Sequence, residues 1–144
     1  MKKLTYDGNV VILTFCVMAA FLLSACATKA PFAVSAVVPA AVGDVVVKQD
    51  KNHNYIIKIE INNLAEPNRL TPPMNAYVVW MVNADNQIKN IGQIVSSSNS
   101  KKRLNGSFIG VSSTKPVRVF ITSENDASVT NSTLSQVVLT TQNL

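Results

Sequence analysis

The chain has 144 residues, with thirteen lysines and arginines against eight acidic residues, which gives a net charge of +5 at neutral pH. This charge is mild and its basic residues are not interleaved with aromatic ones, so the composition argues against a nucleic-acid-binding protein. The length suits a single domain, and two cysteines and one histidine leave little material for thiol-based or metal-based chemistry.

The N-terminal segment has the layout of an export signal. It opens with Met1, Lys2 and Lys3 and continues with the uncharged run VVILTFCVMAAFLL, residues 10–23. A run of this length is typical of a signal peptide and falls short of the ~20 residues that a membrane-spanning helix needs. Two small residues and a cysteine follow at 24–26. Small residues suit the extended backbone that a peptidase grips, and a thiol is a nucleophile that a lipid can alkylate.

Residues 23–26 resemble the lipobox of bacterial lipoproteins, which is an aliphatic residue, two small residues and a cysteine: Leu23, Ser24, Ala25 and Cys26. The resemblance implies that Cys26 receives a diacylglyceryl group, becomes the first mature residue and gains an N-acyl chain such as palmitate in Gram-negative cells. Two or more acyl chains anchor a protein stably. Ala27, in place of aspartate, favours the outer membrane and a domain that faces the periplasm. The alternative is an ordinary signal peptide or signal anchor with an incidental Cys26.

We therefore expect three segments: a lipoprotein signal peptide at 1–25, a lipidated tether at 26–33 and one folded domain at 34–144. Without the leader, 119 residues and a net charge of +4 remain. Cys16 lies in the leader and Cys26 is the lipid site, so the domain has no cysteine for a disulfide or for thiol catalysis.

Alternating apolar and polar residues predict strands along the rest of the chain. Residues 43–49 and 55–62 flank DKNHN and predict a hairpin, with Tyr55, Ile57, Ile59 and Ile61 on one face of its second strand. Residues 63–73 contain three prolines and predict a loop that crosses between sheets. Residues 76–83 are apolar on both faces and predict a central strand. Further strands are expected at 87–95, 103–111, 117–124 and 136–141.

The spacing of turn signals and the absence of a convincing helix pattern predict an all-β fold. We expect an antiparallel, immunoglobulin-like β-sandwich of about 7–8 strands, because turn signals recur roughly every 8–12 residues.

Two stretches, AYVVWMVNADNQIKNIGQI at 76–94 and PVRVFITSEND at 116–126, resemble strands in the extracytoplasmic C-terminal domain of anti-sigma-K-type factors. The shared pattern is a Tyr-x-x-Trp strand, a polar turn, an Ile-Gly partner strand and a later strand that ends in Thr-x-Glu. The resemblance covers residues 43 to 141 and implies a small β-sandwich without catalytic residues. The chain is not expected to carry the sigma-binding domain and spanning helix of those factors, so a sigma-binding role does not transfer.

The side chains that catalysis or metal binding would need are scattered. His53 is expected in an exposed turn, where a lone histidine makes a poor metal site. Glu124 and Asp126 share a loop and are two oxygen donors for calcium, but calcium needs about six or more oxygen ligands, so a solvated loop is favoured. Gly106 and Gly110 are interpreted as strand-edge or bulge positions. We expect no metal and no cofactor.

Binding candidates are few. Lys101, Lys102 and Arg103 form the densest charge cluster, either a solvated turn that protects an edge strand or a contact for anionic lipid or cell-wall polymer. Phe120 is the candidate for an exposed apolar contact. Trp80 and Tyr77 either line a ligand site or, because they face opposite ways on one strand, belong to the core.

The expected function is that of a membrane-anchored envelope lipoprotein whose sandwich is a non-enzymatic binding or structural module. Membrane lipid, through Cys26, and an envelope protein or anionic polymer are the expected partners, and nucleic acid is not. The alternative is an extracytoplasmic sensor or regulatory accessory, as the anti-sigma resemblance suggests. An enzyme would need a deep polar pocket with converging acids.

Overall fold

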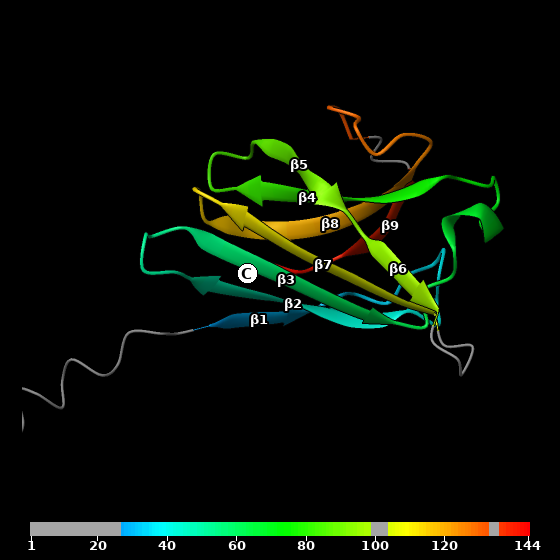
Figure 1. Cartoon of the computed structure of the whole chain (residues 1–144), viewed down its shortest axis with the longest axis horizontal. Coiled ribbons are helices and arrows are strands. Elements are labelled where there is room, and N and C mark those ends of the chain that lie inside the picture. Colours follow the sequence, from blue (N-terminus) through cyan, green and yellow to red (C-terminus); the bar gives the residue numbers. More distant parts are fainter. Residues whose placement is uncertain (1–26, 99–103, 133–135) are drawn as a thin grey trace, which may run out of the picture.

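The computed structural model describes residues 27–98, 104–132 and 136–144, which form two layers of antiparallel strands (Figure 1). The strands are β1 (Thr28–Pro31), β2 (Val42–Gln49), β3 (Tyr55–Asn62), β4 (Ala76–Asn83), β5 (Ile88–Gln93), β6 (Val95–Ser98), β7 (Leu104–Ser112), β8 (Pro116–Glu124) and β9 (Val137–Thr140). One 3-10 turn, η1 (Pro67–Arg69), lies between β3 and β4.

The strand order is that of an immunoglobulin-like sandwich. One sheet runs β1-β2-β3-β7-β6 and the other β5-β4-β8-β9. Strands β2, β3, β7 and β6 take the places of A, B, E and D in the immunoglobulin fold, and β5, β4, β8 and β9 those of C′, C, F and G. The predicted all-β sandwich is confirmed. The described residues form nine strands rather than the expected seven or eight, because β1 adds an edge and residues 87–95 supply parts of two strands.

The predicted hairpin and central strand are confirmed. Strands β2 and β3 pair over their whole length from Val42↔Asn62 to Gln49↔Tyr55, and alternate residues of β3 are buried. Strand β4 is buried along nearly all its length because β5 and β8 flank it and both of its faces are covered. The proline-rich segment crosses from one sheet to the other, as expected.

The strand expected at 87–95 is divided between the two sheets. Strand β5 pairs with β4 through Val78↔Gln93, whereas Val95 already pairs with Ser107 of β7. Ile94 lies at the crossing, where its buried side chain and its N–H bond to the Tyr77 carbonyl hold the chain as it changes sheets.

The folded body begins earlier than the expected boundary at residue 34. Strand β1 lies within the segment expected to be a tether, and it pairs with β2 from Thr28↔Val47 to Pro31↔Asp44. Phe32 then forms a bridge with Thr141. The short sequence TKAP has no strand periodicity of its own, and the free edge of β2 supplies the pairing that makes it a strand.

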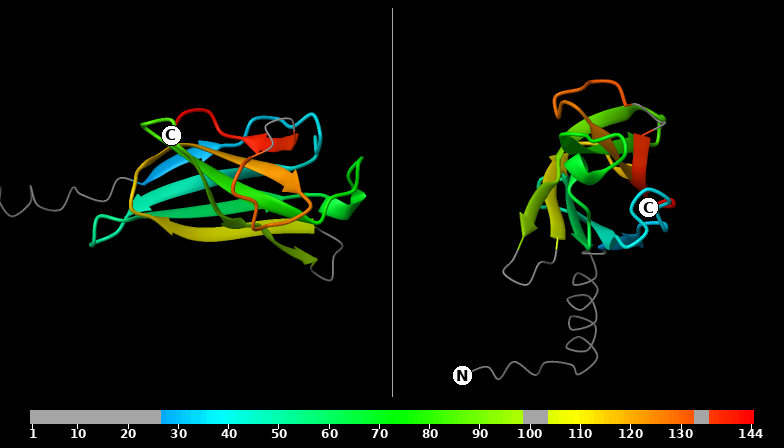
Figure 2. Two further views of the ribbon diagram at one scale, coloured as in Figure 1. Left: turned by 90° about the horizontal axis from the view of Figure 1, so that it is seen from above. Right: turned by 90° about the vertical axis from the view of Figure 1, so that its right-hand side faces the viewer.

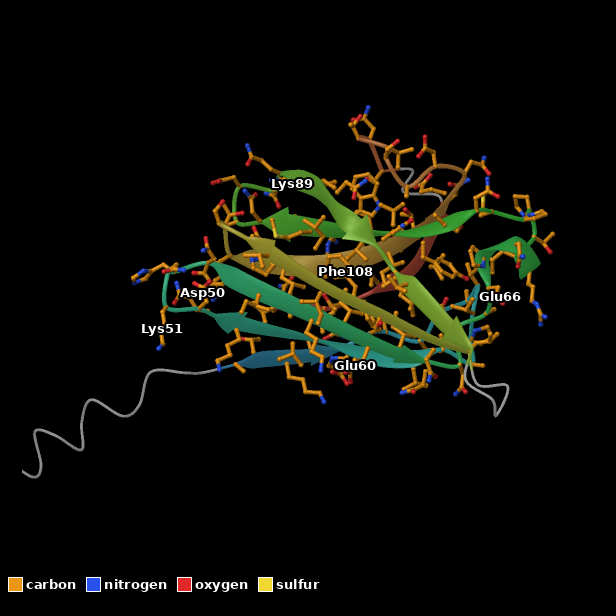
Figure 3. The ribbon with its side chains drawn as sticks, in the orientation of Figure 1. Asp50, Lys51, Glu60, Glu66, Lys89 and Phe108 are labelled. Atoms are coloured by element: carbon orange, nitrogen blue, oxygen red, sulfur yellow. The ribbon has the colours of Figure 1, made fainter. Side chains whose placement is uncertain are left out.

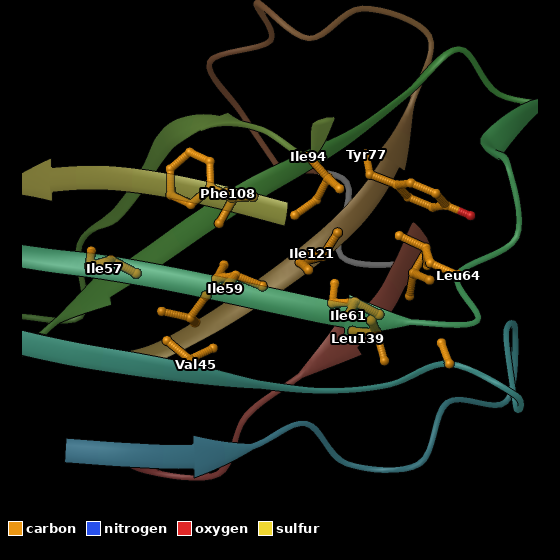
Figure 4. Packing of buried hydrophobic residues seen from close by; sticks show 14 of the residues in the cluster. Val45, Ile57, Ile59, Ile61, Leu64, Tyr77, Ile94, Phe108, Ile121 and Leu139 are labelled. Atoms are coloured by element: carbon orange, nitrogen blue, oxygen red, sulfur yellow. The ribbon is translucent and has the colours of Figure 1, made fainter. Parts of the chain in front are cut away.

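Two apolar clusters stabilise the sandwich. The main core lies between the sheets and includes Ile57, Ile59 and Ile61 from β3 with Ile121 and Leu139 from the other sheet (Figure 4). A second cluster lies on the outer face of the four-stranded sheet and consists of Val78, Trp80, Val82 and Phe120. The connection that follows β8, drawn in orange, lies above the four-stranded sheet in Figure 1 and crosses its outer face in the left-hand view of Figure 2.

Candidate functional site

The residues expected to carry the lipid lie outside the described part of the chain. These are Leu23, Ser24, Ala25 and Cys26. The basic cluster Lys101, Lys102 and Arg103 also lies outside it. Ser98 and Leu104, which flank that cluster in sequence, pair with each other at the end of the sandwich opposite the start of β1.

The expectation that Phe120 is an exposed apolar contact is wrong. Its side chain is only 2% exposed and stacks on Trp80, with ring centroids 6.2 Å apart and an interplanar angle of 13°. The Arg118 guanidinium lies 5.9 Å from the centre of the Phe120 ring. Alternation placed Phe120 correctly on the face away from the main core, but Ala127 and Val129 of the following connection pack over that face.

Tyr77 and Trp80 are core residues, as the opposite-face argument favoured. The Trp80 indole N–H donates to the Thr122 hydroxyl at 2.8 Å, and the Tyr77 hydroxyl donates to the Ala65 carbonyl at 2.8 Å. Burial raises the pKa of Tyr77 to about 12 because the phenolate is poorly solvated there.

The bulge interpretation of Gly106 and Gly110 is wrong, because β3 and β7 pair in continuous register past both of them. Close packing explains the two glycines instead. A Cβ at Gly106 would lie 2.7 Å from Ile94 Cγ2, and one at Gly110 would meet the Phe108 ring. Gly110 also lies beyond the last β6 pair, so it is at an edge on that side.

The acidic side chains of the described residues do not converge. His53 lies in the exposed β2–β3 turn with a positive φ of 64°. Glu124 is buried at the end of β8, whereas Asp126 is exposed on the connection that follows. Within the described ranges, no group of three or more His, Cys, Asp or Glu side chains is arranged to hold a metal ion.

The hollows on the surface of the described residues include two grooves of similar size. The first, about 450 Å³, lies between residues 37–40 and the β3–β4 connection and includes Arg69. The second, about 430 Å³, lies beside β1 and includes Lys29 and Phe32. Among the described residues that line them there is no carboxylate, so neither groove presents an acid pair for hydrolysis.

The end of the sandwich at which β1 begins is the candidate functional surface, and we call it the β1 end. It consists of the start of β1 and the turns at 50–54, 84–87 and 113–115, which meet because Thr28 pairs with Val47, Tyr55 with Ser112 and Asn83 with Pro116. Figure 3 shows Asp50 and Lys51 at this end and Glu66 at the opposite one.

The β1 end carries more positive than negative side chains. Within three residues of the three turns, the exposed cations are Lys48, Lys51, Lys89, Lys115 and Arg118, and the carboxylates are Asp50 and Asp85. At the start of β1, Lys29 pairs with Asp44 at 3.2 Å, so this pair adds no net charge. At the opposite end, the half-buried Glu66 pairs with the exposed Arg69 at 3.3 Å. Asp126 is exposed there, and hydrogen bonds from Ser128 lower its pKa. The described charges are therefore unevenly distributed along the long axis.

Side-chain hydrogen bonds fix the conformation of these turns. The Asp50 carboxylate accepts the N–H groups of Asn52 and Asn54 at 2.8 and 2.9 Å. The Asn83 amide oxygen accepts those of Asp85 and Gln87. Such bonds give each turn one preferred backbone conformation, so the charged side chains project from fixed positions.

No family model, curated protein or solved structure matches the chain. Within residues 27–98, 104–132 and 136–144, no helix is both long and apolar enough to cross a membrane.

Proposed function

We propose that the protein is a membrane-anchored envelope lipoprotein, held through acyl chains on Cys26, whose sandwich is a non-catalytic binding or structural module. The observation that carries the proposal is the position of the lipobox. Leu23, Ser24, Ala25 and Cys26 close an uncharged run of signal-peptide length, and the first strand of the sandwich begins only two residues after Cys26, at Thr28.

This spacing makes cleavage before Cys26 compatible with the fold. Every strand that the structure describes lies downstream of the cut, and the pairing of β1 with β2 is retained. A cut three or more residues later would instead shorten β1. The anchor and the folded body would thus be adjacent in the mature chain.

A binding or structural role is supported by the outer face of the five-stranded sheet. Ile109 and Val111 are 69% and 64% exposed, and Val111 lies opposite Ile56 on β3. The Lys58–Glu60 ion pair lies beside them on the same face. A mixed apolar and charged surface of this kind suits an envelope protein or an anionic polymer as partner.

The test is to replace each of the two cysteines by serine in the full chain. We expect Cys26→Ser to accumulate as uncut precursor because the lipid acceptor is lost, whereas the matched control Cys16→Ser is processed and remains in the membrane fraction. Precursor cleavage and membrane partition are followed by immunoblotting. If Cys26→Ser is cut and released as readily as Cys16→Ser, the proposal is wrong.

A further inference from the structure

We propose that the β1 end docks on the anionic phosphate headgroups of the bilayer that holds Cys26, so that the sandwich stands end-on at the membrane. This inference rests on the proposed lipidation and adds an orientation and a lipid-binding surface to it.

The chain between Cys26 and β1 is too short to let the sandwich move far from its anchor. Cys26 precedes Thr28 by two residues, and two residues span at most about 7 Å. Thr28 is paired with Val47, two residues before the end of β2. An acylated Cys26 therefore holds this end of the sheet within the headgroup layer, which is itself several ångströms deep.

The charge of the β1 end is opposite to that of a phospholipid surface. Five exposed cations against two carboxylates within three residues of the turns at the β1 end complement the negative potential of a phospholipid surface. Each lysine or arginine near such a surface favours binding, and the attraction falls off within about 10 Å at 0.1 M salt. A short tether keeps Lys48 and Lys51 inside this range.

The turns that carry Lys51 and Lys115 are ordered before docking. Lys51 lies in the turn that the Asp50 carboxylate closes. Lys115 follows Thr114, whose N–H donates to the Ser112 hydroxyl. Because these turns are already ordered, docking costs little backbone entropy.

The competing orientation would place on the membrane the opposite end, where Ser98 pairs with Leu104. Its candidate contact is Lys101, Lys102 and Arg103, which lie between these two residues in sequence. Strand β7 has nine residues and spans about 30 Å between the two ends. A tether of about 7 Å cannot bring that end to the bilayer while the sandwich stands upright.

The experiment uses the full chain, processed in cells and reconstituted in vesicles of phosphatidylethanolamine and phosphatidylglycerol. Asn52→Cys places a fluorophore at the β1 end, and Asn68→Cys places one at the opposite end; both asparagines are exposed turn residues. A lipid-borne quencher then reports which end faces the bilayer. We expect quenching several-fold stronger at position 52, and a smaller difference in phosphatidylcholine vesicles or in 0.5 M salt.

Charge variants identify the contact. Combined Lys48→Gln, Lys51→Gln and Lys115→Gln should lower the ratio of docked to undocked protein by roughly fivefold for each lysine lost. The matched control, Lys101→Gln, Lys102→Gln and Arg103→Gln, should leave it unchanged. Equal quenching at both positions, stronger quenching at position 68, or sensitivity only to the control triple would overturn the inference.

Failure of the lipidation proposal has a different signature. An acylated Cys26 leaves the wild-type mature chain without a free thiol, so a maleimide dye should not label it. Labelling of the wild type, with loss from the vesicle fraction, would reject the lipidation itself. If the wild type is unlabelled and bound to vesicles, but quenching is equal at positions 52 and 68, only the proposed orientation is rejected.

Discussion

Trp80, Phe120 and Thr122 link packing and hydrogen bonding in the second apolar cluster. The indole is fully buried, its ring stacks on Phe120 and its N–H has the Thr122 hydroxyl as acceptor. A buried N–H without an acceptor costs about 1–3 kcal/mol. The hydroxyl of Thr122 is therefore what makes a tryptophan, rather than a phenylalanine, tolerable on this face.

We predict that Thr122→Val destabilises the protein by about 1–3 kcal/mol because the indole N–H loses its partner. In a Trp80→Phe background the same change should cost about 1–2 kcal/mol less, since phenylalanine has no N–H. Urea unfolding of the four chains followed by circular dichroism gives the coupling energy. Additive effects would show that the hydrogen bond contributes nothing.

Because the Tyr77 phenol is buried, we expect the protein to lose stability in alkaline solution. Its pKa is raised by burial from 10.0 to about 12, so between these values the unfolded chain releases the phenolic proton and the folded chain keeps it. The contribution of the protonated Tyr77 to the free energy of unfolding is fully present below pH 10. About 2–3 kcal/mol of this free energy is lost by pH 12. Unfolding free energies of wild type and Tyr77→Phe between pH 9 and 12 should show a shallower decline for the variant; parallel curves would contradict the assignment.

At the scale of elements, Asn90 joins β5 to the connection that covers the second cluster. Its side-chain amide donates to the carbonyls of Ala127 and Val129 at 2.9 and 2.8 Å, and its oxygen accepts the Gly92 N–H. One side chain thus holds residues 127–129 over Trp80 and Phe120, which would otherwise face solvent.

Asn90→Ala should loosen this connection. We expect amide hydrogen exchange at residues 125–132 to accelerate by about 5–30-fold, which corresponds to 1–2 kcal/mol of lost hydrogen bonding. Lys89→Ala, at the neighbouring exposed position, is the matched control and should leave exchange unchanged. Equal protection in the two variants would mean that packing alone retains the connection.

The pattern of residues predicted each strand better than its surroundings. Period-two alternation in 55–62 and the doubly apolar run 76–83 fixed their faces correctly, because burial selects side chains directly. Two features of the fold could not be predicted from the pattern. Ile94 marks a change of sheet that depends on which strand its neighbours meet, and the burial of Phe120 depends on a polar-looking connection held by Asn90, some forty residues away in sequence.

At the scale of the whole molecule, the candidate surface was only partly predictable. The sequence locates Cys26 and a basic cluster, but the end of the sandwich nearest Cys26 follows from the pairing of β1 with β2, which the short segment 28–31 does not encode by periodicity. The lysines of the three turns are far apart along the chain and form one surface only after folding. The basic cluster that the sequence singles out lies outside the described residues, and only Ser98 and Leu104, which flank it in sequence, are seen to pair at the other end.

The most direct measurement is mass spectrometry of the N-terminal tryptic peptide from protein extracted from its native membrane. The lipoprotein account predicts a peptide of residues 26–29 whose first residue is Cys26, with a diacylglyceryl group on its sulfur. A peptide that extends upstream of Cys26, or one that begins there with an unmodified thiol, would contradict it.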